Sequence, residues 1–200
     1  MPRNAYQQIV HDYYVDRLRA ISAQRDEELR SIRTRRDALR YQRKVRRAVD
    51  RAFSPHPPRT SLNPVTTGVV GLEHMDIEKV LFESRPGCLV TANLYLPKDL
   101  SGKAPGVLAP CGHTNNGKAG PLYQQFCQRL ARAGFVVLIY DPFSQGERDQ
   151  YHGIQDKLVS QNTFAHNMMG KQLELVGEWF GMWRAWDGIR ALDYLLTRDE

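Results

Sequence analysis

Apolar residues recur at helical spacing in the first quarter of the 200-residue chain. Residues 4–53 contain neither glycine nor proline, and most of them are good helix formers such as Arg, Ala, Gln, Glu and Leu. The apolar stripe is too sparse for a self-sufficient helix. This pattern predicts one long helix or two stacked helices over residues 1–53, docked on another surface.

A proline-rich stretch ends the helical pattern. Four of the eleven residues 54–64 are proline, which excludes a continuing helix and predicts an extended linker over residues 54–66. We therefore expect a domain boundary here. Residues 67–200 are expected to form a separate α/β unit.

Strand patterns follow the linker. Val80 and Phe82 alternate with polar residues, a turn occupies residues 85–87, and apolar residues alternate again over residues 89–96. This pattern predicts a hairpin with one buried face. Residues 106–109 form a continuous apolar run, which predicts a short strand buried on both faces.

Helices and strands then alternate. Pro121 begins a helical pattern that Gly134 ends, and residues 135–140 form the strongest strand pattern of the chain. Strand, helix and strand in this order predict a βαβ unit with two parallel strands. A last helix is expected over residues 173–196, buried on more than one side, with tryptophans that pack in the core rather than stack on a ligand.

Composition and charge set the first quarter of the chain apart from the rest. The chain is 42% hydrophobic, enough for one ordinary globular domain or a little more. Residues 1–51 hold 14 Lys and Arg against 7 acids, a net charge of +7, whereas residues 52–200 carry −1. A nucleic-acid patch over residues 33–47 is one interpretation, but acidic and apolar residues interrupt the run and no nucleic-acid-reading motif accompanies it. We interpret it as a solvated helix face and expect no nucleic-acid partner.

The cysteines and the apolar runs indicate the cellular compartment of the protein. Cys88, Cys111 and Cys127 are odd in number and form no C-x-x-C pair, which favours a reducing compartment. No run of 18 apolar residues occurs, and the first twenty residues lack the apolar segment of a signal peptide. The sequence predicts a cytoplasmic protein with no membrane partner.

The loop over residues 111–120 is the candidate site. It follows the apolar run at residues 106–109 and contains three glycines and two asparagines. Ligands of open parallel sheets bind beyond the carboxyl ends of the strands, and glycine allows backbone N–H groups to point toward an anion. An ordinary loop between a strand and a helix explains the spacing equally well, so the residues alone leave both interpretations open.

Residues 82–196 resemble the N-terminal half of an α/β-hydrolase of the acetyl xylan esterase and dienelactone-hydrolase-like group. Four motifs carry the resemblance: FESRPGCLVTANLYLP, P-x-V-L-x-P-C-G-H-x-x-N-G-K, Y-D-P-x-x-Q-G-E-R and RAWDGIRALDYL. The resemblance implies an α/β fold with a mostly parallel sheet, of which this chain would hold the N-terminal part after a helical segment. No cofactor is implied.

The resemblance also implies roles for the candidate loop. In that fold the loop after the third strand supplies one backbone N–H of the oxyanion hole. Carried over, Gly112 belongs to this loop, the N–H of His113 is the expected donor, and Thr114 is the alternative donor. Asn115 and Asn116 are candidates for substrate contacts. Cys111 stands where the group usually has a histidine, which puts any side-chain role at that position in doubt.

Other catalytic assignments fit the residues less well. His113 precedes the other triad positions, whereas the fold places its histidine last, so we do not expect it to be the general base. Cys111 and His113 are too few ligands for a metal site. Asp141, Ser144 and Gly146 are expected to have structural roles in their loop, because Ser144 lacks the first glycine of G-x-S-x-G.

No serine of the chain lies in a G-x-S-x-G motif, so the triad is absent from residues 1–200. We expect a truncated and inactive piece of a longer serine carboxylic-ester hydrolase, in which the strand at residues 106–109 is left as an open edge. Its substrate would be a small-molecule ester or an acylated carbohydrate.

Two alternatives stay open: a peptidase or carbon–carbon hydrolase of the same fold, and a non-catalytic binding protein that uses the Arg-rich helices. Those helices could equally form a lid, a docking arm or a contact in a homo-oligomer.

Overall fold

The structure is a computed structural model that describes residue 6, residues 8–154 and residues 162–200. The chain divides into two compact units, Met1–Ala52 and Phe53–Glu200. Each unit is described by itself. Among the described residues, no helix is long and apolar enough to cross a membrane.

The first unit consists of two helices, α1 (Ile9–Arg30) and α2 (Arg35–Ala52). A reciprocal cap begins α2: the Thr34 backbone N–H donates to the Asp37 carboxylate (3.1 Å), and the Asp37 N–H donates to the Thr34 hydroxyl (3.2 Å). The Lys44 ammonium contacts the Glu28 carboxylate at 2.6 Å and links the two helices. Neither helix has a buried residue, so this unit contains no core of its own.

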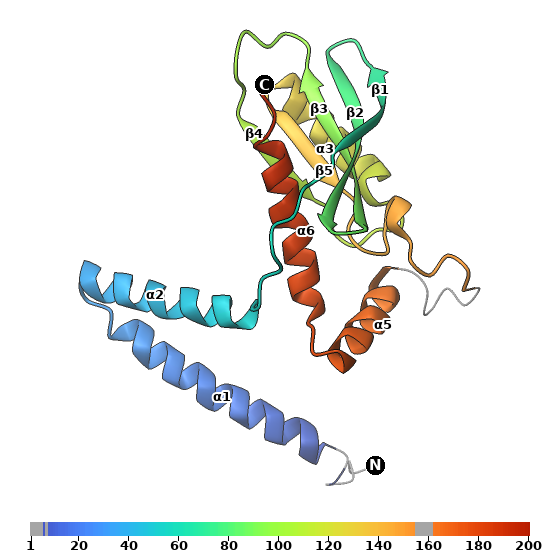
Figure 1. The fold of residues 1–200 in the computed structure, drawn as a ribbon. Helices are drawn as coiled ribbons and strands as arrows, with labels where there is room; N and C mark the ends of the chain where they lie inside the picture. The colour runs from blue at the N-terminus through green and yellow to red at the C-terminus, as the bar shows by residue number, and fades with distance from the viewer. Residues whose placement is uncertain (1–5, 7, 155–161) are drawn as a thin grey trace, which may run out of the picture. The chain divides into compact units, whose positions relative to one another are not determined.

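The second unit is a five-stranded sheet with helices on both faces (Figure 1). The strands are β1 (Val65–Gly71), β2 (Met75–Arg85), β3 (Cys88–Pro97), β4 (Gly106–Pro110) and β5 (Val136–Tyr140). The helices are α3 (Pro121–Arg132), α5 (Asn162–Leu175) and α6 (Phe180–Leu195). The strand order is β1-β2-β3-β5-β4, and the β4–β5 pair is the parallel one. In the part of the sheet that the structure describes, the β1–β2, β2–β3 and β3–β5 pairs are antiparallel.

The core lies on both faces of this sheet. On one face, residues of β2, β3 and β5 pack with Ala191 and Tyr194 of α6. On the other face, Tyr95 and the alternate residues of β5 pack with Cys127 and Ala131 of α3. The predicted hairpin is confirmed, but its predicted single buried face is wrong near Tyr95, because α3 covers the second face there.

The predicted βαβ unit, β4–α3–β5, is also confirmed. Gly134 has φ +89° and ends α3: its N–H donates to the Ala131 carbonyl (2.9 Å), and the Phe135 N–H donates to the Leu130 carbonyl (3.1 Å). All five residues of β5 are buried, as their apolar run predicts. Within the described sheet β4 is the edge strand beside β5, and only Ala109 of this strand is buried. The prediction that β4 is buried on both faces is wrong, whereas the expected open edge is confirmed.

Two sequence predictions fail outside the βαβ unit. Strand β1 begins at Val65, inside the predicted linker, and its seven residues are nearly all exposed, so no buried face imposes the alternation that marks a strand. The last helix is not continuous: Gly177 has φ +74° and separates α5 from α6. Val176 and Leu196 lie in the range of the helix that was expected to be buried on more than one side, but they are 71% and 74% exposed.

Candidate functional site

The candidate loop follows β4 and meets the loop that follows β5. Because β4 and β5 are parallel neighbours, residues 111–120 and residues 141–148 leave the sheet at the same edge. Each loop contains a short 3-10 helix, Gly117–Ala119 and Gly146–Arg148. The Gly146 N–H donates to the Asn115 carbonyl at 3.0 Å, which joins the two loops directly.

Asp141 holds the two loops together. Its carboxylate is fully buried and accepts hydrogen bonds from the Thr91 hydroxyl (2.6 Å), the Lys118 backbone N–H (2.7 Å) and the Lys118 ammonium (2.5 Å). The Lys118 ammonium also contacts the exposed Glu147 carboxylate. A buried carboxylate is stable only when it is paired and hydrogen-bonded, as Asp141 is. These contacts give Asp141 a structural role at the end of β5.

Two glycines make room for this carboxylate. Gly117 has φ +52° and Gly146 has φ +57°, a region that residues with a side chain adopt at a cost. A Cβ atom would lie 2.0 Å from Asp141 Oδ1 at Gly117 and 2.3 Å from it at Gly146. The loops can therefore approach Asp141 only with glycine at both positions.

The peptide between Gly112 and His113 is fixed from two sides. The Gly112 N–H donates to the Tyr123 hydroxyl at 2.8 Å, and the Gly112 carbonyl accepts from the Gln145 amide at 2.8 Å. In a trans peptide the N–H points opposite to the preceding carbonyl, so the bond from Gln145 also sets the direction of the His113 N–H. Among the described residues, the N–H groups of His113 and Thr114 have no hydrogen-bond acceptor. The Gly112 N–H, in contrast, already donates a hydrogen bond to the Tyr123 hydroxyl.

A second histidine lies beside the loop. His166 of α5 is 6% exposed, and its Nε2 lies 2.7 Å from the Phe143 carbonyl. That carbonyl only accepts, so Nε2 carries the proton of a neutral ring, and Nδ1 accepts from His113 Nε2 at 3.1 Å. Burial lowers the pKa of His166, which favours this neutral ring, and the positive charge of Arg184 acts in the same direction. The contact orients the His113 ring and leaves its Nδ1 as an acceptor.

The other predicted residues of the loop lie apart from this centre. The side chains of Asn115 and Asn116 are exposed, and the Thr114 hydroxyl accepts from the Asn116 N–H at 3.4 Å. Cys111 is 4% exposed, and its thiol donates to the Tyr140 carbonyl at 3.4 Å. Burial raises the pKa of the Cys111 thiol to about 12, so this cysteine is not a nucleophile near neutral pH.

Ser144 is buried, and its hydrogen bonds lie within its own loop. It is 3% exposed and has φ +53°, its N–H donates to the Arg148 carbonyl (3.0 Å), and its hydroxyl accepts from the Gln150 N–H (3.5 Å). In the part of the chain that the structure describes, no group of three His, Cys, Asp or Glu residues could hold a metal ion.

Sequence reasoning assigned no role to several residues that build the loop. These are Lys118, Tyr123, Gln145 and His166. Two of them, Lys118 and Gln145, belong to the motifs that carry the family resemblance, and that was the available signal. Tyr123 and His166 meet the loop only through the fold, because they lie on α3 and α5.

Solved structures of esterases share this fold. A protein from Bacteroides fragilis, provisionally named an acetyl xylan esterase, superposes with a TM-score of 0.65 at 18% identity over 82% of this chain. The methylesterase BT1017 superposes with a TM-score of 0.55 at 24% identity, also over 82% of this chain. The aligned part spans 44% and 32% of those two proteins, less than half of each. No protein-family profile and no curated protein sequence matches the chain.

The superpositions confirm the expected α/β fold over the aligned 82% of this chain. At these identities they bear on the fold alone.

Proposed function

We propose that the chain is the N-terminal part of a serine carboxylic-ester hydrolase and that it supplies one oxyanion-hole donor, the backbone N–H of His113. The observation that carries the proposal is the fixed Gly112–His113 peptide. Tyr123 and Gln145 hold Gly112 from both sides, while the His113 N–H has no acceptor among the described residues. An oxyanion donor must be held in place before the reaction and must be free to bind the developing charge.

In the proposed reaction a serine attacks the ester carbonyl. The carbonyl oxygen becomes an oxyanion that the His113 N–H and a second N–H, next to the nucleophile, stabilise. Collapse of this intermediate releases the alcohol and leaves an acyl-enzyme, which a histidine-activated water hydrolyses. Residues 1–200 contain no G-x-S-x-G motif, so the nucleophile would come from sequence after Glu200, and residues 1–200 alone would not hydrolyse esters.

Several observations support this function over an ordinary loop. The loop lies at the carboxyl end of a parallel strand, where α/β proteins bind ligands. Five residues of the two loops, β3 and α3 form hydrogen bonds with Asp141 or Gly112 and fix the geometry of the loop: Thr91, Lys118, Tyr123, Gln145 and Glu147. The solved structures that share the fold include proteins named for ester hydrolysis. Small-molecule esters and acylated carbohydrates are the proposed substrate class.

The test uses the protein encoded by DNA read past Glu200, assayed on p-nitrophenyl acetate with and without a serine-directed phosphonate. A G-x-S-x-G motif together with phosphonate-sensitive hydrolysis is the expected result. A stop codon after Glu200 with an inactive product would contradict the proposal.

Two variants of the active protein then test the donor itself. His113→Pro removes the N–H and should lower kcat by about 10²- to 10³-fold. His113→Ala removes the imidazole but keeps the N–H, so it should retain most of the activity. Equal losses of kcat in both variants would indicate that the reaction requires the His113 imidazole rather than its backbone N–H.

A further inference from the structure

His113 and His166 form a pair of rings beside the candidate loop. The ring centroids are 5.0 Å apart, and His113 Nε2 lies 3.1 Å from His166 Nδ1. The His113 side chain is exposed, whereas His166 is only 6% exposed. The first ring is therefore open to a ligand, and the second can influence a ligand only through the first.

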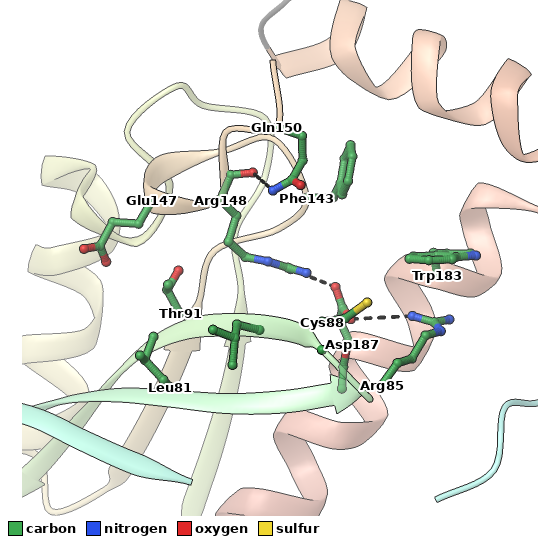
Figure 2. A pocket seen from close by; sticks show the side chains of 13 residues that line it. Leu81, Arg85, Cys88, Thr91, Phe143, Glu147, Arg148, Gln150, Trp183 and Asp187 are labelled. Atoms are coloured by element: carbon green, nitrogen blue, oxygen red, sulfur yellow. Dashed lines mark hydrogen bonds and ion pairs between the residues drawn. The ribbon is translucent and has the colours of Figure 1, made fainter. Parts of the chain in front are cut away.

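The buried ring is held from two sides. Its Nε2 lies 2.7 Å from the Phe143 carbonyl, and the centroid of the Phe180 ring lies 5.2 Å from that of His166. The loop that carries Phe143 is fixed in turn, because Arg148 of this loop donates to Asp187 of α6 at 2.8 Å, as Figure 2 shows. His166 is thus anchored to a well-braced part of the fold.

This anchor determines which nitrogen of each neutral ring carries the proton. The Phe143 carbonyl only accepts, so His166 donates from Nε2 and accepts at Nδ1. His113 must then donate from Nε2, and its Nδ1 keeps a lone pair. Among the described residues, no group donates a hydrogen bond to His113 Nδ1. The pair therefore presents one unpartnered acceptor on an exposed ring whose orientation is fixed.

The acceptor belongs to the same residue as the proposed oxyanion donor. Nδ1 is the ring nitrogen next to Cγ, so it is the one nearer to the backbone of His113, whose N–H has no acceptor among the described residues. A small ligand that accepts from this N–H can donate to Nδ1 as well. A neutral donor is favoured over an ammonium, because the nearby positive charge of Arg184, which also lowers the pKa of His166, disfavours a second cation.

We propose that His113 Nδ1 accepts a hydrogen bond from a free hydroxyl next to the ester bond of the substrate, and that His166 is the positioning residue for this contact. The contact rests on the ester hydrolysis proposed above. It narrows the substrate class to partly acylated polyols, carbohydrates among them, because these carry a free hydroxyl beside the acylated one. A site that accepts a substrate hydroxyl discriminates against the analogue that lacks it, since the acceptor then loses its partner.

Two matched acetates test this preference in the protein encoded by DNA read past Glu200. Ethylene glycol monoacetate can donate to Nδ1, whereas its methyl ether keeps the oxygen but has no proton to donate. After correction for their rates of alkaline hydrolysis, the parent should prefer the free hydroxyl by about 3- to 10-fold in kcat/KM. His113→Ala and His166→Leu should each bring the corrected ratio close to one. His74→Gln, an exposed change, should keep the ratio of the parent.

The failure of this contact can be told apart from the failure of the proposed function. p-Nitrophenyl acetate carries no free hydroxyl, so its hydrolysis reports on the function alone. Hydrolysis of this ester together with the same corrected ratio in the parent and in His113→Ala would overturn the contact only. No hydrolysis of any ester would contradict the function and the contact together.

NMR of residues 1–200 tests the proton positions without turnover. Protein with isotope-labelled histidine is measured at pH 8, and His113→Ala and His166→Leu identify the two sets of ring signals. In the parent both neutral rings should carry the proton on Nε2, and in His166→Leu the His113 ring should populate both tautomers. Thermal unfolding verifies that both variants are folded. A proton on His113 Nδ1 in the parent would overturn the proposal whatever the hydrolysis rates are.

Discussion

The side-chain amide of Gln145 donates to the carbonyl oxygen of Gly112 at 2.8 Å, across 33 positions of sequence. Gln145 is 1% exposed, so its side chain is part of the interior rather than of the surface. The bond joins the loop after β5 to the loop after β4 and sets the orientation of the peptide that carries the His113 N–H. A buried glutamine thus determines the direction of a surface backbone group.

Removing this bond should weaken the fold modestly. Gln145→Leu leaves the Gly112 carbonyl without its donor, and we expect a loss of about 1–3 kcal/mol in the free energy of unfolding. Urea unfolding followed by tryptophan fluorescence is suitable, because all three tryptophans lie in the sheet-containing unit. Tyr151→Phe, which removes an exposed hydroxyl bonded to Gln172, is the control and should cost less than about 0.5 kcal/mol. A smaller effect in Gln145→Leu than in the control would mean that water replaces the amide.

The glycines beside Asp141 should not tolerate a methyl group. Gly117→Ala and Gly146→Ala combine a positive φ with a Cβ atom at 2.0 Å and 2.3 Å from a buried carboxylate oxygen. Gly134→Ala has a positive φ as well, but no atom lies within 4 Å of its Cβ. Gly134→Ala should cost about 1–2 kcal/mol of stability. Gly117→Ala and Gly146→Ala should each lose about 1–3 kcal/mol more stability than Gly134→Ala, measured by the same urea titration. Similar losses in all three variants would show that the loops move away from Asp141 easily.

The ion pair between Lys118 and Asp141 should be far more important than the one between Lys118 and Glu147. Asp141→Asn leaves the buried Lys118 ammonium without its buried carboxylate partner, and we expect a loss of about 3–5 kcal/mol in stability. Glu147→Gln removes a carboxylate that is 72% exposed, and its effect should stay below about 1 kcal/mol. Thermal unfolding of both variants separates these outcomes. Equal losses in the two variants would contradict this prediction, because Glu147 would then contribute as much as Asp141 to the pairing of Lys118.

His166 should make stability depend on pH. Burial lowers its pKa below the usual 6.5, so the unfolded chain binds a proton at a pH where the folded protein does not. Its contribution is fully present above pH about 6.5 and is lost as the pH falls from there toward the lowered pKa. His166→Gln should be less stable than the parent at pH 7.5 but should lose less stability between pH 6.5 and pH 5. His74→Gln, an exposed change, should show the slope of the parent. An unchanged slope in His166→Gln would indicate that folding does not shift the pKa of His166.

Local sequence signals predicted the parts of the fold that are defined by burial or by turn chemistry. Strand β5 is apolar throughout and buried throughout, and Gly87 and Gly134 stand where positive φ is required. Strand β1 escaped prediction because its residues face solvent. Gly177 escaped because a single glycine in a helical pattern costs only about 1 kcal/mol, and its exposed apolar neighbours resembled a core stripe.

The sequence indicated which loop forms the candidate site, but it did not indicate which side chains contact that loop. The glycines and asparagines of residues 111–120 indicate an unusual backbone, and the structural role of Asp141 followed from its place at the end of a strand. The burial of Lys118 could not be predicted, because lysine is almost always exposed unless it is paired. His166 lies 53 positions from His113, and only the packing of α5 brings the two rings together.

The position of β4 at the edge of the described sheet has a consequence for handling residues 1–200. Its outer row of peptide groups faces away from β5, in a strand that carries Val107 and Leu108 and no charged side chain. Such a border is a template on which the same strand of another molecule can add, in register, and extend the sheet from one copy to the next. Preparations of residues 1–200 should therefore self-associate as concentration rises, and a lysine at Leu108 should keep them dispersed.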